Sequence, residues 1–318
     1  MTKRSNHRLP GFFPAPLRPW LAAFVVGLSL LVIGSSAHAL SPQEAALLAD
    51  YQVIRSKLSH NPFGVPVYVQ SLDQGDLLTA EVYGQVDYPL ERLKAALAEP
   101  DGWCGLLALT LNVKACIHDK HDEHRWLTLY MGRKFYQPPD KTNQVRFQFQ
   151  PAVSTPGYFE VALSAADGPL GTRDYRIVMQ ATSIPEGTLI HIRSAYRSST
   201  ASQWATSLYL TTLGRGKIGF SADGVDSDGQ PKYVEGVRGT IERNTMRYYL
   251  ALQAALETWD LPTNDRFEAR IQHWFALTER YRPQLHEMDR AEYLHAKRQE
   301  HINQLRLQNM QTAQVTSP

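Results

Sequence analysis

The sequence predicts an α+β fold: a curved antiparallel sheet wrapped around a long helix late in the chain, with extra helices before and after it. Two observations predict this fold. Short segments that alternate apolar and polar residues follow one another between residues 127 and 196, with turn residues between them. A long amphipathic helix then follows over residues 239–258, and the sequence shows no βαβ pattern of the kind that builds a parallel sheet.

The first 39 residues have the pattern of a secretory signal peptide. A basic, proline-containing stretch precedes the apolar run LAAFVVGLSLLVIG over residues 21–34. Ala37 and Ala39 fit the A-x-A pattern that signal peptidase reads, which predicts cleavage between Ala39 and Leu40. The apolar run is shorter than the about 20 residues that span a membrane. We therefore expect a periplasmic or secreted protein, and an uncleaved N-terminal anchor is the alternative.

The charge of the chain changes sign when this leader is set aside. The whole chain has 33 Lys and Arg against 31 Asp and Glu, a formal charge of +2. Four of the basic residues and none of the acidic ones precede residue 40, so the rest of the chain carries −2. A nucleic-acid-binding protein would carry a clustered basic face in its folded part. The balance argues against nucleic acid as a partner and favours burial of an apolar ligand over electrostatic attraction.

Two cysteines, Cys104 and Cys116, lie close together in the sequence. Because oxidising compartments favour pairing, we expect a disulfide between them. It would restrict the unfolded chain and contribute about 3 kcal/mol for so short a loop. The alternatives are two buried free thiols or a catalytic thiol, and only Lys114 lies near enough in the sequence to lower a thiol pKa.

The elements before the cysteines begin with a capping box. Ser41-Pro42-Gln43-Glu44 predicts a helix that starts with Pro at its first position and runs to about residue 59. Asn61-Pro62-Phe63-Gly64 ends it. Strands are expected over residues 65–72 and 77–86, and short helices over 89–98 and 103–109.

The elements after the cysteines are an antiparallel meander and a set of helices. Strands are expected around residues 127–131, 145–149, 159–163, 175–179 and 190–196. A helix over 200–213, a hairpin over 217–225 and 232–236, and helices over 239–258, 265–281 and 291–307 follow. The last ten residues are expected to be frayed.

Three passages resemble the START and Bet v 1-like (SRPBCC) helix-grip superfamily. They are the residues from Asp87-Tyr88-Pro89-Leu90 through Trp103, the strand opening Gly168-Pro169-Leu170-Gly171-Thr172-Arg173-Asp174-Tyr175, and the long helix over 237–256. The resemblance covers roughly residues 65–258 and implies a cavity between sheet and helix that binds a lipid or sterol-like molecule. It also implies a division into an N-terminal helix (40–61), a START-like domain (62–260) and a C-terminal helical extension (261–318). Some lipid-carrying START domains have an arginine where this chain has Met179.

Seven residues are candidates for contact with that ligand. Arg173 and Asp174 could orient a polar head group, and the alternative is a structural ion pair at the start of a strand. Aromatic side chains could line the cavity, and the alternative is that they are ordinary core residues. The aromatic candidates are Trp103, Tyr130, Tyr196, Tyr248 and Tyr249.

Other motifs predict no metal or cofactor site. His118, His121 and His124 lie among carboxylates and could bind a metal, but their spacing of three residues favours a solvated hairpin loop. Residues 223–229 lack the glutamate of a Ca²⁺ loop, and residues 214–219 match a dinucleotide motif in letters only. No nucleophile-elbow motif is present.

The sequence therefore predicts an exported protein that binds a hydrophobic ligand, without a cofactor and without nucleic acid as a partner. One alternative is a cyclase- or hydrolase-type enzyme that uses the same cavity, with His191, Arg193 or Asp174 pointing inward. Another is an envelope assembly protein that docks through its C-terminal helices. These helices carry mixed charge, so a solvated or clasping face is expected and peripheral membrane contact is a further alternative. The ligand and the oligomeric state are left open.

Overall fold

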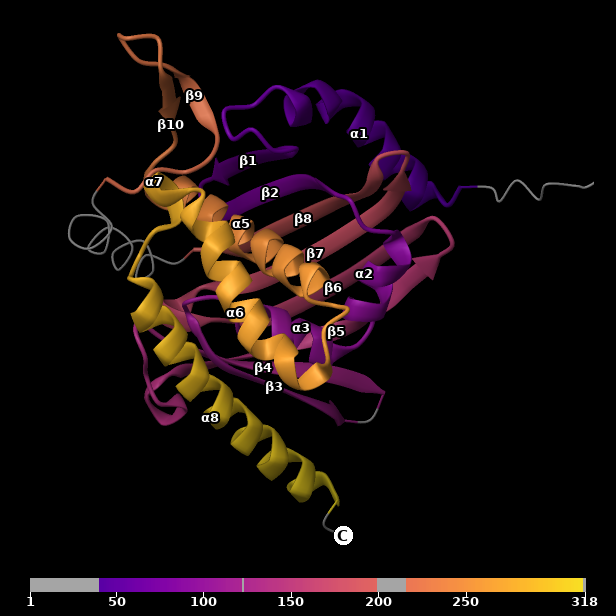
Figure 1. Ribbon diagram of the computed structural model, residues 1–318, viewed down its shortest axis with the longest axis vertical. Coiled ribbons are helices and arrows are strands. Elements are labelled where there is room, and N and C mark those ends of the chain that lie inside the picture. Colours follow the sequence, from indigo (N-terminus) through magenta and orange to yellow (C-terminus); the bar gives the residue numbers. More distant parts are fainter. Residues whose placement is uncertain (1–39, 122, 199–215, 317–318) are drawn as a thin grey trace, which may run out of the picture. The chain divides into compact units, whose positions relative to one another are not determined.

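The computed structural model describes residues 40–316 except residue 122 and residues 199–215. It contains an eight-stranded antiparallel sheet with the order β1-β2-β8-β7-β6-β5-β4-β3 (Figure 1). The strands are β1 (Val67–Gln74), β2 (Leu77–Val86), β3 (Val113–His121), β4 (His124–Met131), β5 (Asn143–Thr155), β6 (Tyr158–Asp167), β7 (Arg173–Ile184) and β8 (Gly187–Arg197). The predicted α+β class and antiparallel meander are confirmed. The helix expected over residues 200–213 lies outside the described residues.

The edge strand β3 is not predicted by the sequence. The solvated hairpin loop expected around His118, His121 and His124 is wrong for most of its length, because β3 and β4 pair as far as His121 and His124. The first five residues of β3 are all buried, Lys114 among them. Helices α3 (Pro100–Leu107) and α8 (Arg290–Thr316) both pack on this strand, so no apolar–polar alternation marks it in the sequence.

Helix α5 (Gly236–Glu257) packs on the face of the sheet that carries most of the apolar core, which we call the inner face. The predicted helix over residues 239–258 agrees with it within three residues. It contacts β1, β2 and β8. At Gly84 in β2 the ring of Tyr249 lies so close that an added Cβ would be 2.3 Å from it. Glycine at this position allows the helix to approach the sheet.

Helix α1 (Pro42–Ser59) covers part of the opposite face, which we call the outer face. The hydroxyl of Ser41 accepts a hydrogen bond from the backbone N–H of Glu44 at 3.1 Å, as the capping motif predicts. An apolar stripe of the helix packs on side chains of β2, β6 and β8. The cluster comprises Leu47, Tyr51, Ile54, Leu58, Tyr83, Tyr158 and Leu189.

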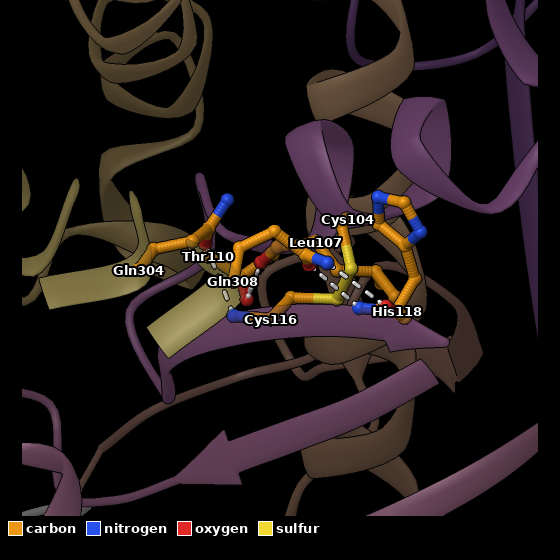
Figure 2. The surroundings of a disulfide bond; sticks show 7 residues. All are labelled: Cys104, Leu107, Thr110, Cys116, His118, Gln304 and Gln308. Carbon is orange, nitrogen blue, oxygen red and sulfur yellow. Dashed lines mark hydrogen bonds between the residues drawn. A yellow bond between two sulfur atoms is a disulfide. The ribbon is translucent and has the colours of Figure 1, made fainter. Parts of the chain in front are cut away.

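Helices α2 (Leu90–Leu97) and α3 connect the first two strands to the edge strand β3. Cys104 in α3 and Cys116 in β3 form the predicted disulfide, with their Cα atoms 5.1 Å apart (Figure 2). Both cysteines are buried. The disulfide therefore fixes α3 on the inner side of the edge strand.

Helix α8 covers the free edge of β3. The side chain of Gln304 accepts a hydrogen bond from the backbone N–H of Cys116 at 3.0 Å. The amide of Gln308 pairs with the N–H and the carbonyl of His118 at 2.9 and 3.0 Å (Figure 2). The helix continues to Thr316, so the expectation that the last ten residues fray is wrong for those described. Such side-chain pairing blunts an edge that could otherwise pair with another chain.

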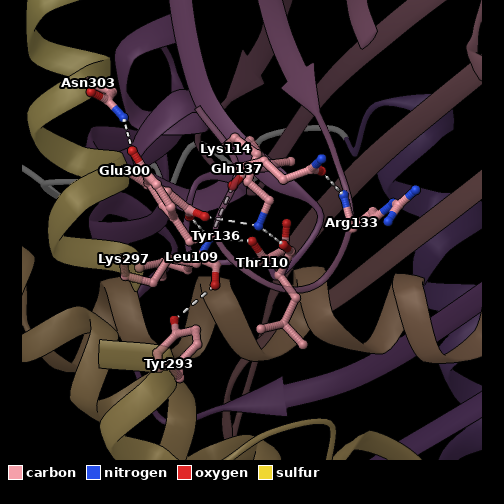
Figure 3. Close-up of polar contacts among 12 residues, drawn as sticks. Leu109, Thr110, Lys114, Arg133, Tyr136, Gln137, Tyr293, Lys297, Glu300 and Asn303 are labelled. Atoms are coloured by element: carbon pink, nitrogen blue, oxygen red, sulfur yellow. Dashed lines mark hydrogen bonds and ion pairs between the residues drawn. The ribbon is translucent and has the colours of Figure 1, made fainter. Parts of the chain in front are cut away.

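A buried ionic cluster joins α8 to the same region. Glu300 accepts from Lys114 at 2.9 Å and from Lys297 at 2.7 Å (Figure 3). Lys297 also donates to the backbone carbonyls of Thr110 and Val113. All three charged side chains are less than 5 % exposed. Because each charge has several partners, the cluster satisfies the condition for burying ions.

Four further elements lie in the C-terminal part of the described chain. They are the hairpin strands β9 (Ala222–Val225) and β10 (Pro231–Tyr233) and the helices α6 (Thr263–Glu279) and α7 (Arg282–Leu285). The hairpin turn is closed by the carboxylate of Asp226, which accepts from the N–H groups of Asp228 and Gln230. In the described part of the chain, no helix is both long enough and apolar enough to span a membrane.

Candidate functional site

Three tyrosines gather at one end of the space between the inner face and α5. The rings of Tyr175 in β7 and Tyr196 in β8 stack with centroids 5.2 Å apart. Phe147 meets Tyr175 edge to face at 6.1 Å. Tyr248 on α5 packs on the same core. Burial raises the pKa of all three tyrosines, that of Tyr248 to about 12, so their hydroxyls are neutral hydrogen-bonding groups near pH 7.

A bulge in β7 directs Tyr175 toward Tyr196. The register with β8 shifts between Arg173 and Arg176. Asp174 has φ of 55°, which is uncommon for a residue other than glycine and tolerated by aspartate. The extra residue is therefore accommodated at Asp174, and the next side chain faces inward.

Ser194 supplies a polar group on this apolar face. Its backbone pairs with Ala80 of β2 and Ile177 of β7, near the middle of the sheet. The hydroxyl is buried and has no hydrogen-bond partner within the described chain. A buried hydroxyl without a partner costs free energy, so a polar group of a bound molecule would be favoured here.

A pocket of about 580 Å³, which we call the arginine pocket, opens beside α5. Arg243 and Arg247 lie one turn apart on this helix and are both buried. Arg243 donates to the carbonyls of Lys217 and Ile218 and to the hydroxyl of Thr240. The pocket is lined by Asn112, Arg133, Lys134, Phe135, Thr240, Arg243, Asn244, Arg247, Glu287, Met288 and Glu292.

One carboxylate, Glu287, organises the cations of the arginine pocket. It pairs with Lys134 at 2.6 Å and with Arg247 at 2.9 Å. Burial lowers the pKa of Lys134 to about 8, although Glu287 opposes this. Burial raises the pKa of Glu287, but Arg247 and Lys134 lower it more, and the net shift is downward. Glu287 is therefore ionised, and Lys134 is mostly protonated at neutral pH.

A second pocket, of about 720 Å³, lies among α3, α6 and α8. Its lining includes Lys114, Lys297 and Glu300, which are paired with one another. It also includes Arg266 and Arg270 from α6. Since the buried charges here already have partners, this pocket is a weaker candidate for recognition of a ligand.

Strand order and helix placement decide the fold type. Strands β1 and β2 pair, the chain makes helices α2 and α3, strands β3 to β8 return in sequence order to pair with β2, and α5 closes the inner face. The chain has the helix-grip fold of the START and Bet v 1-like proteins. The resemblance predicted from the sequence is confirmed for this arrangement of elements.

Comparison with solved structures returns proteins of low sequence identity and low TM-score. A STAR-related lipid transfer protein from Xanthomonas axonopodis is 10 % identical, with 45 % of this chain and 83 % of that chain covered and a TM-score of 0.33. Ara h 8.0201 is 9 % identical, with coverage of 43 % and 91 % and a TM-score of 0.28. A protein of unknown function from Enterococcus faecalis is 9 % identical, with coverage of 71 % and 96 % and a TM-score of 0.35. No family model and no curated protein matches the chain.

Two predicted aromatic residues of this helix-grip protein are packed in its core. Trp103 is 2 % exposed, and its indole N–H donates to the carbonyl of Leu97 at 3.0 Å. Tyr249 is 2 % exposed and packs on Gly84. Neither meets the tyrosine group formed by Tyr175, Tyr196 and Tyr248 in the contacts described. Their part in ligand binding stays a prediction.

The expectation that Tyr130 lines the space under α5 is wrong. Tyr130 packs with Ala115, Ile117 and Leu307, which places it on the outer face near α8. Its neighbours Leu129 and Met131 belong to the core side instead. Because side chains alternate along a strand, Tyr130 cannot share a face with them.

Arg173 and Asp174 lie at an exposed end of the sheet. Arg173 contacts Asp76 at 3.3 Å and Asp174 at 3.7 Å, and Arg197 pairs with both carboxylates. The side chains of Arg173 and Asp174 are 53 % and 59 % exposed. This is the geometry of a surface ion-pair network, which contributes little to stability. A head-group role for these two residues stays a prediction.

The residues expected to face inward in an enzyme do not do so. His191 stacks on Tyr83 at 4.1 Å and bonds to Gln180 on the outer face. Burial lowers its pKa to about 4, so it is neutral at physiological pH. Arg193 lies on the same face and is half-exposed. The version of the enzyme alternative that needs His191 and Arg193 inside the cavity is therefore contradicted.

The three histidines near residue 120 do not form a metal site in the part of the chain that can be described. No group of three or more metal-binding side chains occurs among those residues. The ring of His124 is instead within 3.1 Å of the amide of Gln148. All three histidines lie in the hairpin of β3 and β4, whose paired strands take up most of the expected loop.

Proposed function

We propose that this protein is exported and binds a hydrophobic molecule, a lipid or sterol-like compound, between the inner face and α5. The observation that carries the proposal is the tyrosine group with Ser194. Tyr175, Tyr196 and Tyr248 keep accessible surface although they lie between a sheet and a helix, where neighbouring side chains are fully buried. An apolar wall with few polar groups is typical of a site for a small apolar ligand.

Export is the second part of the proposal. The predicted leader over residues 1–39 supports it, and so does the disulfide between Cys104 and Cys116. Disulfides persist in oxidising compartments and are rare in the cytosol. Fractionation of cells that express the full chain should place the protein, shortened at Ala39, in the periplasm or medium. Recovery of uncleaved protein in the membrane fraction would support an anchor instead.

The binding proposal is tested by what the protein carries. Protein purified under native conditions should release an apolar compound on extraction with organic solvent, in a constant molar ratio visible by mass spectrometry. After delipidation it should take up a fluorescent lipid or sterol probe with saturation. Absence of both a bound compound and saturable uptake would contradict the proposal.

Two matched tyrosine variants test whether the ligand binds on the inner face of the sheet. Tyr196→Ala removes a ring of the tyrosine group, so we expect at least a fivefold loss of probe affinity. Tyr130→Ala removes the same ring from the outer face of the same sheet and should leave affinity unchanged. Equal losses in both variants, measured at matched thermal stability, would argue against a site on the inner face.

A further inference from the structure

Among the described residues that line it, the arginine pocket has more cationic than anionic side chains. Arg243 and Arg247 are 2 % and 4 % exposed, and a guanidinium stays protonated in a protein. Among the described residues of the lining, four cations face two carboxylates. The cations are Arg133, Lys134, Arg243 and Arg247, and the carboxylates are Glu287 and Glu292. Glu287 is shared by two of the cations, and Glu292 lies at the exposed start of α8.

Arg247 has a buried donor without an acceptor. One terminal nitrogen donates to Asn244 at 3.2 Å and the other to Glu287 at 2.9 Å. The remaining nitrogen, Nε, is buried and has no hydrogen-bond partner within the described residues. A charged donor left without an acceptor is costly. An oxyanion is the chemical group that would satisfy both this donor and the excess charge.

Helix α5 contributes residues both to the arginine pocket and to the tyrosine group. Arg247 and Tyr248 are consecutive on α5, and the positive charge of Arg247 acts on the Tyr248 hydroxyl, partly opposing the effect of burial on its pKa. Phe135 and Met288 give the pocket apolar surface beside its charges. An anionic group held in the pocket would therefore lie next to the apolar space under α5.

We propose that the arginine pocket binds the anionic head group, a carboxylate or phosphate, of an amphiphile whose apolar part lies between the inner face and α5. This inference rests on the proposed function and names the class of ligand. It assigns Arg247 the direct contact with the anion, with Arg243, Lys134 and Arg133 supplying further positive charge.

Affinities for three compounds with the same chain test the inference. Dodecanoate, dodecyl phosphate and dodecanol would each compete with a fluorescent apolar probe on the delipidated full chain. We expect both anions to bind at least tenfold more tightly than the alcohol. Equal affinity for all three would overturn the head-group assignment and leave the proposed function standing. If none of the three compounds binds and the probe does not bind either, the result would contradict the proposed function itself.

Matched arginine variants test whether the preference for anions over the alcohol depends on the arginine pocket. Arg247→Gln should reduce the anion-to-alcohol affinity ratio to near one, and Arg247→Lys should retain part of it. Arg146→Gln, on the outer face where its side chain is 52 % exposed, should leave the ratio unchanged. The ratio compares ligands on one protein, so partial unfolding of a variant does not mimic the result. An unchanged ratio in Arg247→Gln would refute the role of this residue.

Inorganic phosphate distinguishes a head group from a free anion. It should weaken dodecyl phosphate binding at millimolar concentrations and leave dodecanol binding unaffected. Tighter binding of inorganic phosphate than of dodecyl phosphate would show that the pocket serves a free anion and would overturn the proposal.

Discussion

At the scale of single residues, the sheet and helix α5 meet most tightly at Gly84, where there is no room for a side chain. Gly84 faces the ring of Tyr249, whose hydroxyl also reaches the carbonyl of Gln85 at 3.4 Å. Ser194 shows the reverse condition, a buried hydroxyl that lacks a partner within the described chain. One position is fully packed and the other has unused hydrogen-bonding capacity. The two therefore respond differently to substitution.

Gly84→Ala should destabilise the protein by about 1–3 kcal/mol. The new methyl group would overlap the ring of Tyr249, and overpacking of a core typically costs this much. Urea unfolding followed by circular dichroism measures the change. Gly105→Ala is the control, because its Cβ would meet only a side-chain nitrogen of Arg270 at 3.4 Å and alanine favours a helix. Similar stability of Gly84→Ala and wild type would contradict the close packing of Tyr249 on Gly84.

The sequence contained enough information to place Tyr130 correctly. Leu127, Leu129 and Met131 alternate with Thr128 and Tyr130, so the same pattern that predicts the strand puts Tyr130 on the other face. By contrast, no local pattern shows that Arg243 and Arg247 are buried. Their partners come from segments distant in the sequence, and only the folded chain brings Glu287 to them.

At the scale of elements, α8 acts as a cover for the edge of the sheet. Its two glutamines replace the missing neighbour strand of β3 with three hydrogen bonds. The mixed charge of the C-terminal helices predicts either a solvated or a clasping face, and this contact of α8 is of the clasping kind. The sequence could not predict β3 itself, because burial on both sides removes the alternation that identifies a strand.

Replacing both Gln304 and Gln308 with alanine should free the edge of β3. We expect a loss of about 3 kcal/mol, because three hydrogen bonds are removed and each contributes about 1 kcal/mol. Amide exchange should accelerate at Cys116 and His118, whose N–H groups lose their acceptors. Asn309→Ala, at an exposed position of the same helix, is the control. Unchanged exchange at these two amides would refute the claim that α8 protects the edge of β3.

The buried lysines predict a pH dependence of stability. Burial lowers the pKa of Lys297 to about 8, below its ordinary 10.5. Between these two values the unfolded chain binds more protons than the folded chain, so the unfolding free energy contributed by Lys297 rises with pH. Lys297→Met should reduce this slope between pH 8 and 9.5 in urea unfolding. An identical slope in the variant would show that Lys297 titrates normally.

At the scale of the whole molecule, the antiparallel meander and its closing helix follow from the sequence more securely than the site does. Turns and alternation predict an antiparallel meander, and a long apolar stripe predicts the helix that closes it. The two pockets described lie where segments far apart in the sequence meet, so spacing in one sequence could not predict them. The tyrosine group was predicted in part, through Tyr196 and Tyr248, while Tyr175 and Ser194 were not.

Photo-crosslinking can locate an apolar ligand bound between the inner face and α5. A fatty acid with a diazirine on its chain would be bound to the delipidated protein, irradiated, and mapped by tandem mass spectrometry. We expect labels on α5 itself and on residues that face α5 from β7 and β8, such as Ile177, Ser194 and Tyr196, and we expect unlabelled fatty acid to compete with them. Saturable labels confined to outer-face residues such as Arg176 and Arg193, or to α8, would contradict binding between the inner face and α5.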